Sequence, residues 1–314
     1  MSEFFPEGYL IDTQDNKTAL FSASNLAQAH RNGKLLEAKA IRCDNEHNLV
    51  VDLQCMTGII PREEGAIGIK EGVTRDIAVI SRVGKPVCFV ISGFDTDNEK
   101  NRTRAILSRR SAQEICLNDF ISKLIPGDII NAKVTHMENF GAFADIGCGI
   151  ISFLPIDCIS ISRIFHPCER FKIGMNIRVA IKSIIGGRIN LTHKELLGTW
   201  EENAQFFHIG ETISGIARSI EDYGVFIELT PNLAGLAELK ENVRQGQHTS
   251  VYIKNIIPEK MKIKLVIIEN FDSVQETTYP KYFFKGNHIS KFLYSPPMCS
   301  KIIETNFEMI TSRA

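Results

Sequence analysis

Apolar and polar residues alternate over short runs through most of the chain, and this pattern predicts β-strands with one buried face. One such run is NFGAFADI at residues 139–146, where alanine and isoleucine side chains make one apolar face. Phe143 and Asp145 fall on the opposite face, which we expect to meet solvent. A phenylalanine in that place suggests a role other than core packing.

The stretch around this run is repeated 83 residues later in the chain. PGDIINAKVTHMENFGAFADI, from Pro126, aligns with IGETISGIARSIEDYGVFIEL, from Ile209. The shift carries Phe143 onto Phe226, with Glu228 beside it on the outward face. One offset that holds over such a length indicates an internal repeat.

A fainter copy lies 94 residues upstream of the middle one. At that offset Leu49 takes the place of Phe143, or Val50 after a slip of one residue, and Glu46 takes the place of Phe140. None of these three residues is aromatic, so we expect the first copy to be a poor stacking surface and to serve as a spacer or a protein-docking module.

Each copy holds five short apolar runs with one longer polar connection, which predicts a small five-stranded barrel of the OB type. The fold class is therefore mainly β, with three tandem OB-type barrels joined by short helical linkers. We expect an N-terminal helix over residues 18–34 and a C-terminal extension, rich in aromatic residues, with a hairpin turning at residues 285–287. The predicted segments are 1–32 (helical), 33–112 (first barrel), 113–126 (linker), 127–193 (second barrel), 194–209 (linker), 210–270 (third barrel) and 271–314 (extension).

The two later copies each place an aromatic residue, a glycine and a second aromatic residue on the outward face. A ring on an open strand face stacks on any nucleobase and contributes about 1–3 kcal/mol per base. The glycine leaves room for a ligand to approach, and basic residues of the connection and the fifth strand can meet phosphates. The candidate RNA-binding residues are Phe140, Phe143, Arg163, Arg188, Asn190, Tyr223, Phe226, Lys262 and Lys264. The alternative, that the rings pack under the polar connection as a secondary core, stays open on the repeat alone.

Composition limits the possible partners. The net charge is −1 and the pI about 6.7, so any binding of nucleic acid must rely on local charge and on stacking. Eight cysteines occur without a CxxC pair, which argues against a disulfide framework or a zinc site. The chain lacks a long apolar run and its first residues lack a secretory signal, so we expect a cytoplasmic protein without a membrane partner.

These stretches and the linker HKELLGTWEENAQFF, residues 193–207, resemble the RNA-binding domains of bacterial small-subunit ribosomal protein S1. The resemblance covers residues 33–270, is closer in the last two copies, and is nearest to the short forms of Gram-positive bacteria. It implies OB-type barrels that bind single-stranded RNA through aromatic residues of strands two and three and a basic residue of strand five. The matching residues are Phe140, Phe143 and Arg188 in the second copy, and Tyr223, Phe226 and Lys262 in the third.

The chain also departs from that family pattern. Family domains often have a histidine after the third strand, where this chain has Pro61, Pro155 and Glu238. The family aspartate before the basic residue of strand five is replaced by Ile184 and Pro258. A glutamate on an RNA-binding face is unfavourable, so the second barrel is the first place to expect RNA.

The sequence contains no GxxxxGK[ST], GxGxxG, HExxH or GxSxG motif. The acidic run at residues 95–99 lacks the glycine of a calcium loop, and Cys158, His166 and Cys168 lack a fourth ligand for zinc. We therefore expect a protein that is not an enzyme, with no cofactor, no metal and no small-molecule substrate.

The expected ligand is single-stranded RNA such as mRNA, and the expected role is in translation at the small ribosomal subunit, with small-subunit proteins as partners. Two alternatives remain open at this point. One is a protein-docking module, and the other is a regulatory RNA-binding protein outside the ribosome, such as a stress or RNA-decay factor.

Overall fold

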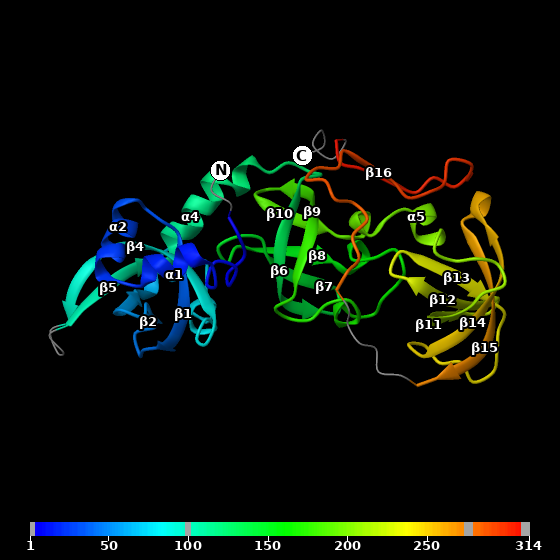
Figure 1. Ribbon diagram of the computed structural model, residues 1–314, viewed down its shortest axis with the longest axis horizontal. Coiled ribbons are helices and arrows are strands. Elements are labelled where there is room, and N and C mark those ends of the chain that lie inside the picture. Colours follow the sequence, from blue (N-terminus) through cyan, green and yellow to red (C-terminus); the bar gives the residue numbers. More distant parts are fainter. Residues whose placement is uncertain (1–3, 98–101, 273–278, 309–314) are drawn as a thin grey trace. The chain divides into compact units, whose positions relative to one another are not determined.

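The computed structural model describes residues 4–97, 102–272 and 279–308 (Figure 1). It divides into two compact units, one of residues 1–124 with 145–151 and the other of residues 125–144 with 152–314. Three closed barrels of five strands make up most of the chain, which confirms the predicted OB-type fold class.

The first barrel closes in the order β1-β2-β3-β5-β4. Its strands are β1 (Leu36–Cys43), β2 (Leu49–Asp52), β3 (Thr57–Ile60), β4 (Pro86–Asp97) and β5 (Arg102–Ser108). The alternating apolar residues of these strands, with the helices before β1, form one continuous core. Three short helical segments lie between or beside the strands, namely η1 (Arg62–Glu64), α3 (Ile77–Ile80) and, after β5, α4 (Arg109–Asp119).

The second barrel has the strand order β10-β8-β7-β6-β9. Its strands are β6 (Ile129–Glu138), β7 (Gly141–Asp145), β8 (Ile151–Pro155), β9 (Asn176–Ile185) and β10 (Arg188–Thr192). The long connection between β8 and β9 carries two single turns, η3 (Ile156–Cys158) and η4 (Pro167–Glu169). This is the longer polar connection that the sequence predicts in the second copy.

The third barrel repeats this plan in the order β11-β12-β13-β15-β14. Its strands are β11 (Thr212–Glu221), β12 (Gly224–Thr230), β13 (Leu233–Ala237), β14 (His248–Ile257) and β15 (Lys262–Phe271), with η6 (Pro258–Lys260) before the last. Its core also takes in Trp200 from the preceding linker and Phe292 and Phe307 from the extension, so these segments fold together with the barrel.

The N-terminal helical segment consists of two helices, α1 (Gln14–Leu20) and α2 (Ala23–Arg31), where the sequence predicted one. The break lies at Ser22, whose backbone is extended and whose hydroxyl accepts from the Asn25 N–H to start α2. A serine before a helical run is a strong N-cap, and it explains why the helix restarts there.

Short helices occupy both linkers, as predicted. The first linker holds α4 and the turn η2 (Ile121–Lys123). The second holds η5 (Lys194–Leu197) and α5 (Trp200–Ala204), which are separated by Gly198 at φ 87°. At 11 residues, α4 is the longest helix in the described ranges, and none there has the length and apolar character needed to cross a bilayer.

The C-terminal extension forms a two-stranded sheet of β16 (Lys291–Leu293) and β17 (Glu304–Asn306). The prediction of a hairpin that turns at residues 285–287 is therefore wrong. The aromatic-rich stretch in which it was predicted begins at residue 277, and residues 277–278 lie outside the described residues. Residues 284–287 instead run along the second barrel, where Arg178 donates to the carbonyls of Phe284 and Gly286 at 2.8 and 2.6 Å. Hydrogen bonds from a side chain of the barrel strand β9 to these carbonyls fix the path, and no local sequence pattern reports them.

Candidate nucleic-acid interface

Three aromatic rings gather on one face of the second barrel. Phe140 follows β6, Phe143 lies on β7 and Phe153 lies on β8. The ring centroid of Phe143 is 6.2 Å from that of Phe140 and 5.3 Å from that of Phe153, and Phe140 and Phe153 are 5.7 Å apart. His136 extends the group, with its ring stacked 6.1 Å from Phe143. We call Phe140, Phe143 and Phe153 the ring cluster.

The ring cluster is partly open to solvent. Phe140 is 58% exposed, while Phe143 and Phe153 are half-buried. The structure therefore brings together the two predicted rings of this barrel and adds one that the sequence reasoning missed. The signal was present in ISFLP, residues 151–155, where a phenylalanine stands at the position that the third copy fills with Leu236.

Gly141 has a different role from the predicted one. A Cβ at this position would lie 2.4 Å from the Leu154 carbonyl oxygen and 2.7 Å from the Phe153 ring. The glycine thus allows β8 and the Phe153 ring to approach β7. It leaves room for the ring cluster itself and not for a ligand.

Asp145 does not share the solvent-facing side with Phe143, contrary to the prediction. It is 2% exposed and accepts hydrogen bonds from the N–H groups of Glu7 at 2.7 Å and Gly147 at 2.9 Å. Burial raises the pKa of its carboxyl to about 7. The period-two pattern failed here because the partner comes from the N-terminal segment, 138 residues away.

Polar and basic residues lie next to the ring cluster on β10. Asn190 pairs with Phe153 across the parallel strands β10 and β8, and its amide donates to the Ser183 hydroxyl at 3.2 Å. Arg188 lies two residues before it on the same side of the strand and is exposed. A phosphate beside the rings would meet this edge.

The third barrel carries a reduced version of the same face. The rings of Tyr223 and Phe226 are 6.2 Å apart in a T-shaped arrangement, and Tyr223 is 68% exposed. Phe226 pairs with Leu236, which in turn pairs with Lys264, so the three lie side by side on β12, β13 and β15. Lys262 and Lys264 are both exposed. Two rings and two lysines replace the three rings and the arginine of the second barrel.

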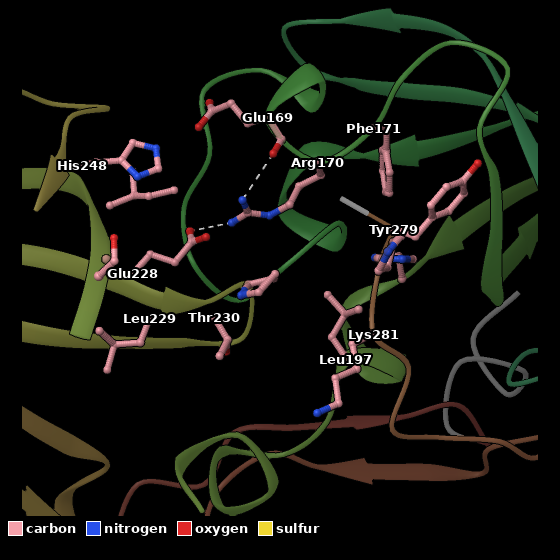
Figure 2. A pocket seen from close by; sticks show the side chains of 16 residues that line it. Glu169, Arg170, Phe171, Leu197, Glu228, Leu229, Thr230, His248, Tyr279 and Lys281 are labelled. Carbon is pink, nitrogen blue, oxygen red and sulfur yellow. Dashed lines mark hydrogen bonds and ion pairs between the residues drawn. The ribbon is translucent and has the colours of Figure 1, made fainter. Parts of the chain in front are cut away.

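Glu228 is also not on the outward face, contrary to the prediction. It is 5% exposed and lies between two buried arginines, at 2.7 Å from Arg218 Nε and 2.5 Å from Arg170 Nη2. Figure 2 shows Glu228 facing Arg170. Glu169 forms a further ion pair with Arg218. Because Arg170 belongs to the second barrel and Glu228 to the third, this charge cluster joins the two barrels inside one unit.

A cavity of about 330 Å³ lies against this charge cluster. Figure 2 shows it between the barrels, with Tyr279 and Lys281 of the extension on one side and His248 of β14 on the other. His193, which is fully enclosed in the same wall, lies 3.3 Å from the Tyr282 hydroxyl, and burial lowers the pKa of its imidazole to about 4. A neutral histidine of this kind holds the extension against the barrel.

Arg163 lies apart from the strands that carry the rings. It is exposed on the connection after β8 and lines a pocket together with Asn139 and Phe165. Since Asn139 directly precedes Phe140, this pocket adjoins the ring cluster.

The first barrel has no aromatic residue at the equivalent of Phe226. After the same bulge in the strand pairing, Val50 pairs with Ile59 as Phe226 pairs with Leu236. The slip of one residue therefore gave the right match, and Val50 rather than Leu49 corresponds to Phe226.

The same register makes His47 the counterpart of Tyr223, so the prediction of Glu46 at this place is wrong. His47 has a φ of 66°, and its Nδ1 lies 3.4 Å from Asp76 Oδ2. Asp76 also accepts from Arg62 Nε at 2.7 Å. The His47 imidazole therefore contacts the ion pair of Asp76 and Arg62 and is not a free ring for stacking as Tyr223 is.

Among the residues that the structure describes, no three histidine, cysteine, aspartate or glutamate side chains gather to hold a metal ion. Cys158 receives a hydrogen bond from Lys182 Nζ at 3.0 Å, and His166 Nδ1 accepts from the Cys168 N–H at 3.1 Å. These bonds engage the side chains of Cys158 and His166, whereas Cys168 contributes only its backbone N–H and its thiol is exposed.

Comparison with known proteins adds family information. Residues 123–194 match the S1 RNA binding domain. Small ribosomal subunit protein bS1 of Staphylococcus aureus (strain COL) is 29% identical over 264 residues, covering 78% of this chain and 64% of that protein. The same protein of Rhizobium meliloti (strain 1021) is 28% identical over 242 residues, covering 71% and 41%.

The chain therefore resembles ribosomal protein bS1, and it spans 64% and 41% of the lengths of these two relatives. A crystal structure of a multidomain protein with nucleic acid binding domains from Streptococcus pneumoniae aligns over 78% of this chain and 76% of that chain, with 15% identity and a TM-score of 0.25. The solution structure of GSP13 from Bacillus subtilis aligns over 22% and 55%, with 21% identity and a TM-score of 0.21.

Proposed function

We propose that this chain binds single-stranded RNA by stacking bases on the ring cluster of the second barrel and on Tyr223 and Phe226 of the third. The observation that carries the proposal is the ring cluster itself, three phenylalanines within about 6 Å of one another with Phe140 open to solvent. Apolar rings left on a strand face in contact with water are typical of a base-stacking platform.

The charges on this face are few, and this agrees with binding led by stacking. Arg188 and Asn190 border the second platform, and Lys262 and Lys264 border the third. With about one or two phosphate contacts per barrel, the affinity falls only gently with salt, since each contact on a single strand contributes about −0.7 to the logarithmic slope. An exposed Glu238 next to β13 weakens the third platform relative to the second.

Two platforms in one chain raise the affinity beyond that of either. Once one barrel holds a strand of RNA, the other meets the same strand at a high effective concentration. The charge cluster of Arg170, Arg218 and Glu228 joins these two barrels and reduces the freedom that binding has to remove.

The test is a titration of unstructured RNA with the double variant Phe143→Ala, Phe226→Ala. Loss of one stacked base on each barrel should weaken binding at least tenfold, while circular dichroism shows the barrels still folded. An affinity equal to that of the wild type would overturn the proposal.

The bS1 relatives are small ribosomal subunit proteins, and we propose the corresponding setting for this chain: the cytoplasm, with mRNA as ligand in translation and small-subunit proteins as neighbours. Co-sedimentation with small subunits in a sucrose gradient separates this role from that of a regulatory RNA-binding protein outside the ribosome. Recovery only in the ribosome-free fraction, with full RNA affinity, would favour the regulatory role.

A second candidate function concerns the first barrel, which has no ring platform. Val73, Ile77, Ile80 and Val83 are exposed on and around α3, and such a group of apolar side chains is typical of a protein-docking surface. Ile77→Asp should reduce co-sedimentation with small subunits and leave the RNA affinity unchanged if this surface docks on a ribosomal protein. Unchanged co-sedimentation would remove this candidate.

A further inference from the structure

A pocket in the second barrel lies next to the ring cluster, and none of the three cluster rings lines it. It has a volume of about 440 Å³ and is formed almost entirely by the connection between β8 and β9. The lining residues are Asn139, Ile156, Asp157, Ser160, Ile161, Ser162, Arg163, Ile164 and Phe165. We call this the connection pocket.

The connection pocket begins where the ring cluster ends. Asn139 lines the pocket and directly precedes Phe140, the most exposed ring. The Ile156 N–H donates to the Phe140 carbonyl at 3.0 Å, which ties the first residue of the pocket wall to the rim of the rings. A strand of RNA that leaves the rings past Phe140 would therefore enter the pocket next.

The wall of the pocket is held in place by the third barrel. The Ile161 N–H donates to Asn232 Oδ1 at 3.0 Å, and the Ser162 N–H donates to the Pro231 carbonyl at 3.0 Å. Asn232 is itself fully buried, and its amide donates to two carbonyls of the preceding linker. A connection held in this way is preorganised, so a ligand does not have to order it.

The chemistry of the lining fits a nucleotide. Ile156, Ile161 and Ile164 supply apolar surface, and the Phe165 ring is 51% exposed at the edge of the pocket. Arg163 is exposed, and no hydrogen bond or ion pair engages its guanidinium within the described part of the chain. A flat base can lie against the apolar wall and Phe165, while a planar guanidinium offers paired donors to a phosphate.

The position of Asp157 limits where a phosphate can bind in the connection pocket. Its side chain is also exposed at the pocket and, when ionised, is an acceptor only. A phosphate beside it would be repelled, so the anionic group belongs at the Arg163 end. The base then takes the interior, where the Asp157 carboxylate and the Asn139 amide can meet its hydrogen-bonding edge.

From this geometry we propose that the connection pocket is an additional nucleotide subsite, which takes a base of the same RNA strand beyond those stacked on the ring cluster and binds its phosphate through Arg163. The subsite rests on the proposed RNA-binding function. It lengthens the footprint of the second barrel along the strand and adds a polar element to a platform that otherwise relies on stacking.

The test compares RNA oligonucleotides of two lengths, about three and about eight nucleotides, because barrels of this type cover about 4–16 nucleotides. Arg163→Ala should weaken binding of the longer oligonucleotide about fivefold or more and reduce its logarithmic salt slope by about 0.7, as for one lost phosphate contact. It should leave the shorter oligonucleotide unaffected. Phe165→Ala should weaken binding of the longer oligonucleotide without changing the logarithmic salt slope of that binding.

Lys172→Ala is the matched control, since Lys172 is an exposed cation of the same connection outside the pocket. It should bind both lengths like the wild type. Equal losses on both lengths for Arg163→Ala, or equal effects of Arg163→Ala and Lys172→Ala, would overturn the subsite.

Phe140→Ala in the same series separates the two proposals. If it weakens both lengths while Arg163→Ala matches the wild type, the subsite is wrong and the ring platform stands. If Phe140→Ala also matches the wild type on both lengths, the stacking proposal fails, and the subsite that rests on it fails too.

Discussion

Glu228→Gln is the perturbation whose effect follows most directly from the structure. The carboxylate is 5% exposed and compensates two buried guanidinium groups, with Arg218 Nε at 2.7 Å and Arg170 Nη2 at 2.5 Å from the same oxygen. The other oxygen accepts from Arg218 Nη2 at 3.2 Å. Glutamine keeps the shape and one acceptor but removes the charge.

The size of the effect can be worked out from these contacts. The glutamine oxygen can replace the carboxylate oxygen that serves both arginines, and its NH₂ group then faces Arg218 Nη2, donor against donor. One hydrogen bond to a charged group is lost, at about 1.5–3 kcal/mol. Arg170 also loses the charge that compensated it, and Arg218 keeps only its ion pair with Glu169. We therefore expect a total of about 3–5 kcal/mol, as when one partner of a buried ion pair is removed.

The assay is urea unfolding followed by circular dichroism, with the transitions fitted separately because a chain of several barrels need not unfold in one step. Glu238→Gln is the control, since Glu238 is exposed and should change the free energy of unfolding by less than about 0.5 kcal/mol. If Glu228→Gln also changes the free energy of unfolding by less than about 0.5 kcal/mol, the charge cluster does not stabilise the contact between the two barrels.

Three further predictions concern the rings, the fifth strand and the extension. Phe153→Leu, which gives the second barrel the residue of the third, should keep the fold and weaken RNA binding about fivefold, in line with the loss of about 1 kcal/mol of stacking; an unchanged dissociation constant would exclude Phe153 from the interface. Arg188→Ala should reduce the logarithmic salt slope of RNA binding by about 0.7. Lys301→Ala, which removes an exposed lysine of the extension, should leave this slope unchanged. Equal slopes for the wild type and both variants would contradict a phosphate contact at Arg188. The pKa of His193 is about 4 in the folded chain against an ordinary 6.5, so the unfolded chain takes up the proton first as the pH falls, and the free energy of unfolding should drop by up to about 3 kcal/mol between these values. In His193→Gln the free energy of unfolding should no longer fall in this way between about pH 6.5 and pH 4. A pH profile equal to that of the wild type would show that the fall does not come from His193.

The barrels could be predicted from the sequence because their determinants are local. Alternating apolar residues specify each strand, and one offset relates the second and third copies over their whole first hairpin. The same offset placed Phe140 with Phe143 and Tyr223 with Phe226, and the structure brings each of these pairs together. Whether they bind RNA stays a prediction.

The residues that could not be predicted are those whose partners lie far away in the chain. The strand alternation predicts that Asp145 and Glu228 face outward, yet both are buried. A backbone N–H 138 residues away stabilises Asp145, and Arg170, 58 residues away, together with Arg218 of the neighbouring strand stabilises Glu228. The path of the extension depends on Arg178 and Tyr282, which are 104 residues apart. Periodicity reports the side of a strand and says nothing of what covers it.

His47 shows a smaller error of the same origin. The strand pairing places a bulge at the same point of the first and third barrels, and only this register identifies His47 as the counterpart of Tyr223. A fixed offset of 94 residues misses it by one position.

Ultraviolet crosslinking of the intact chain to unstructured RNA, with the crosslinked residues located by mass spectrometry, would show whether bases stack on the rings of the second and third barrels. We expect crosslinks at Phe140, Phe143 and Tyr223, more in the second barrel than in the third, and none at His47 or Val50 of the first. Crosslinks confined to the first barrel or to the extension, with none on these rings, would contradict this expectation.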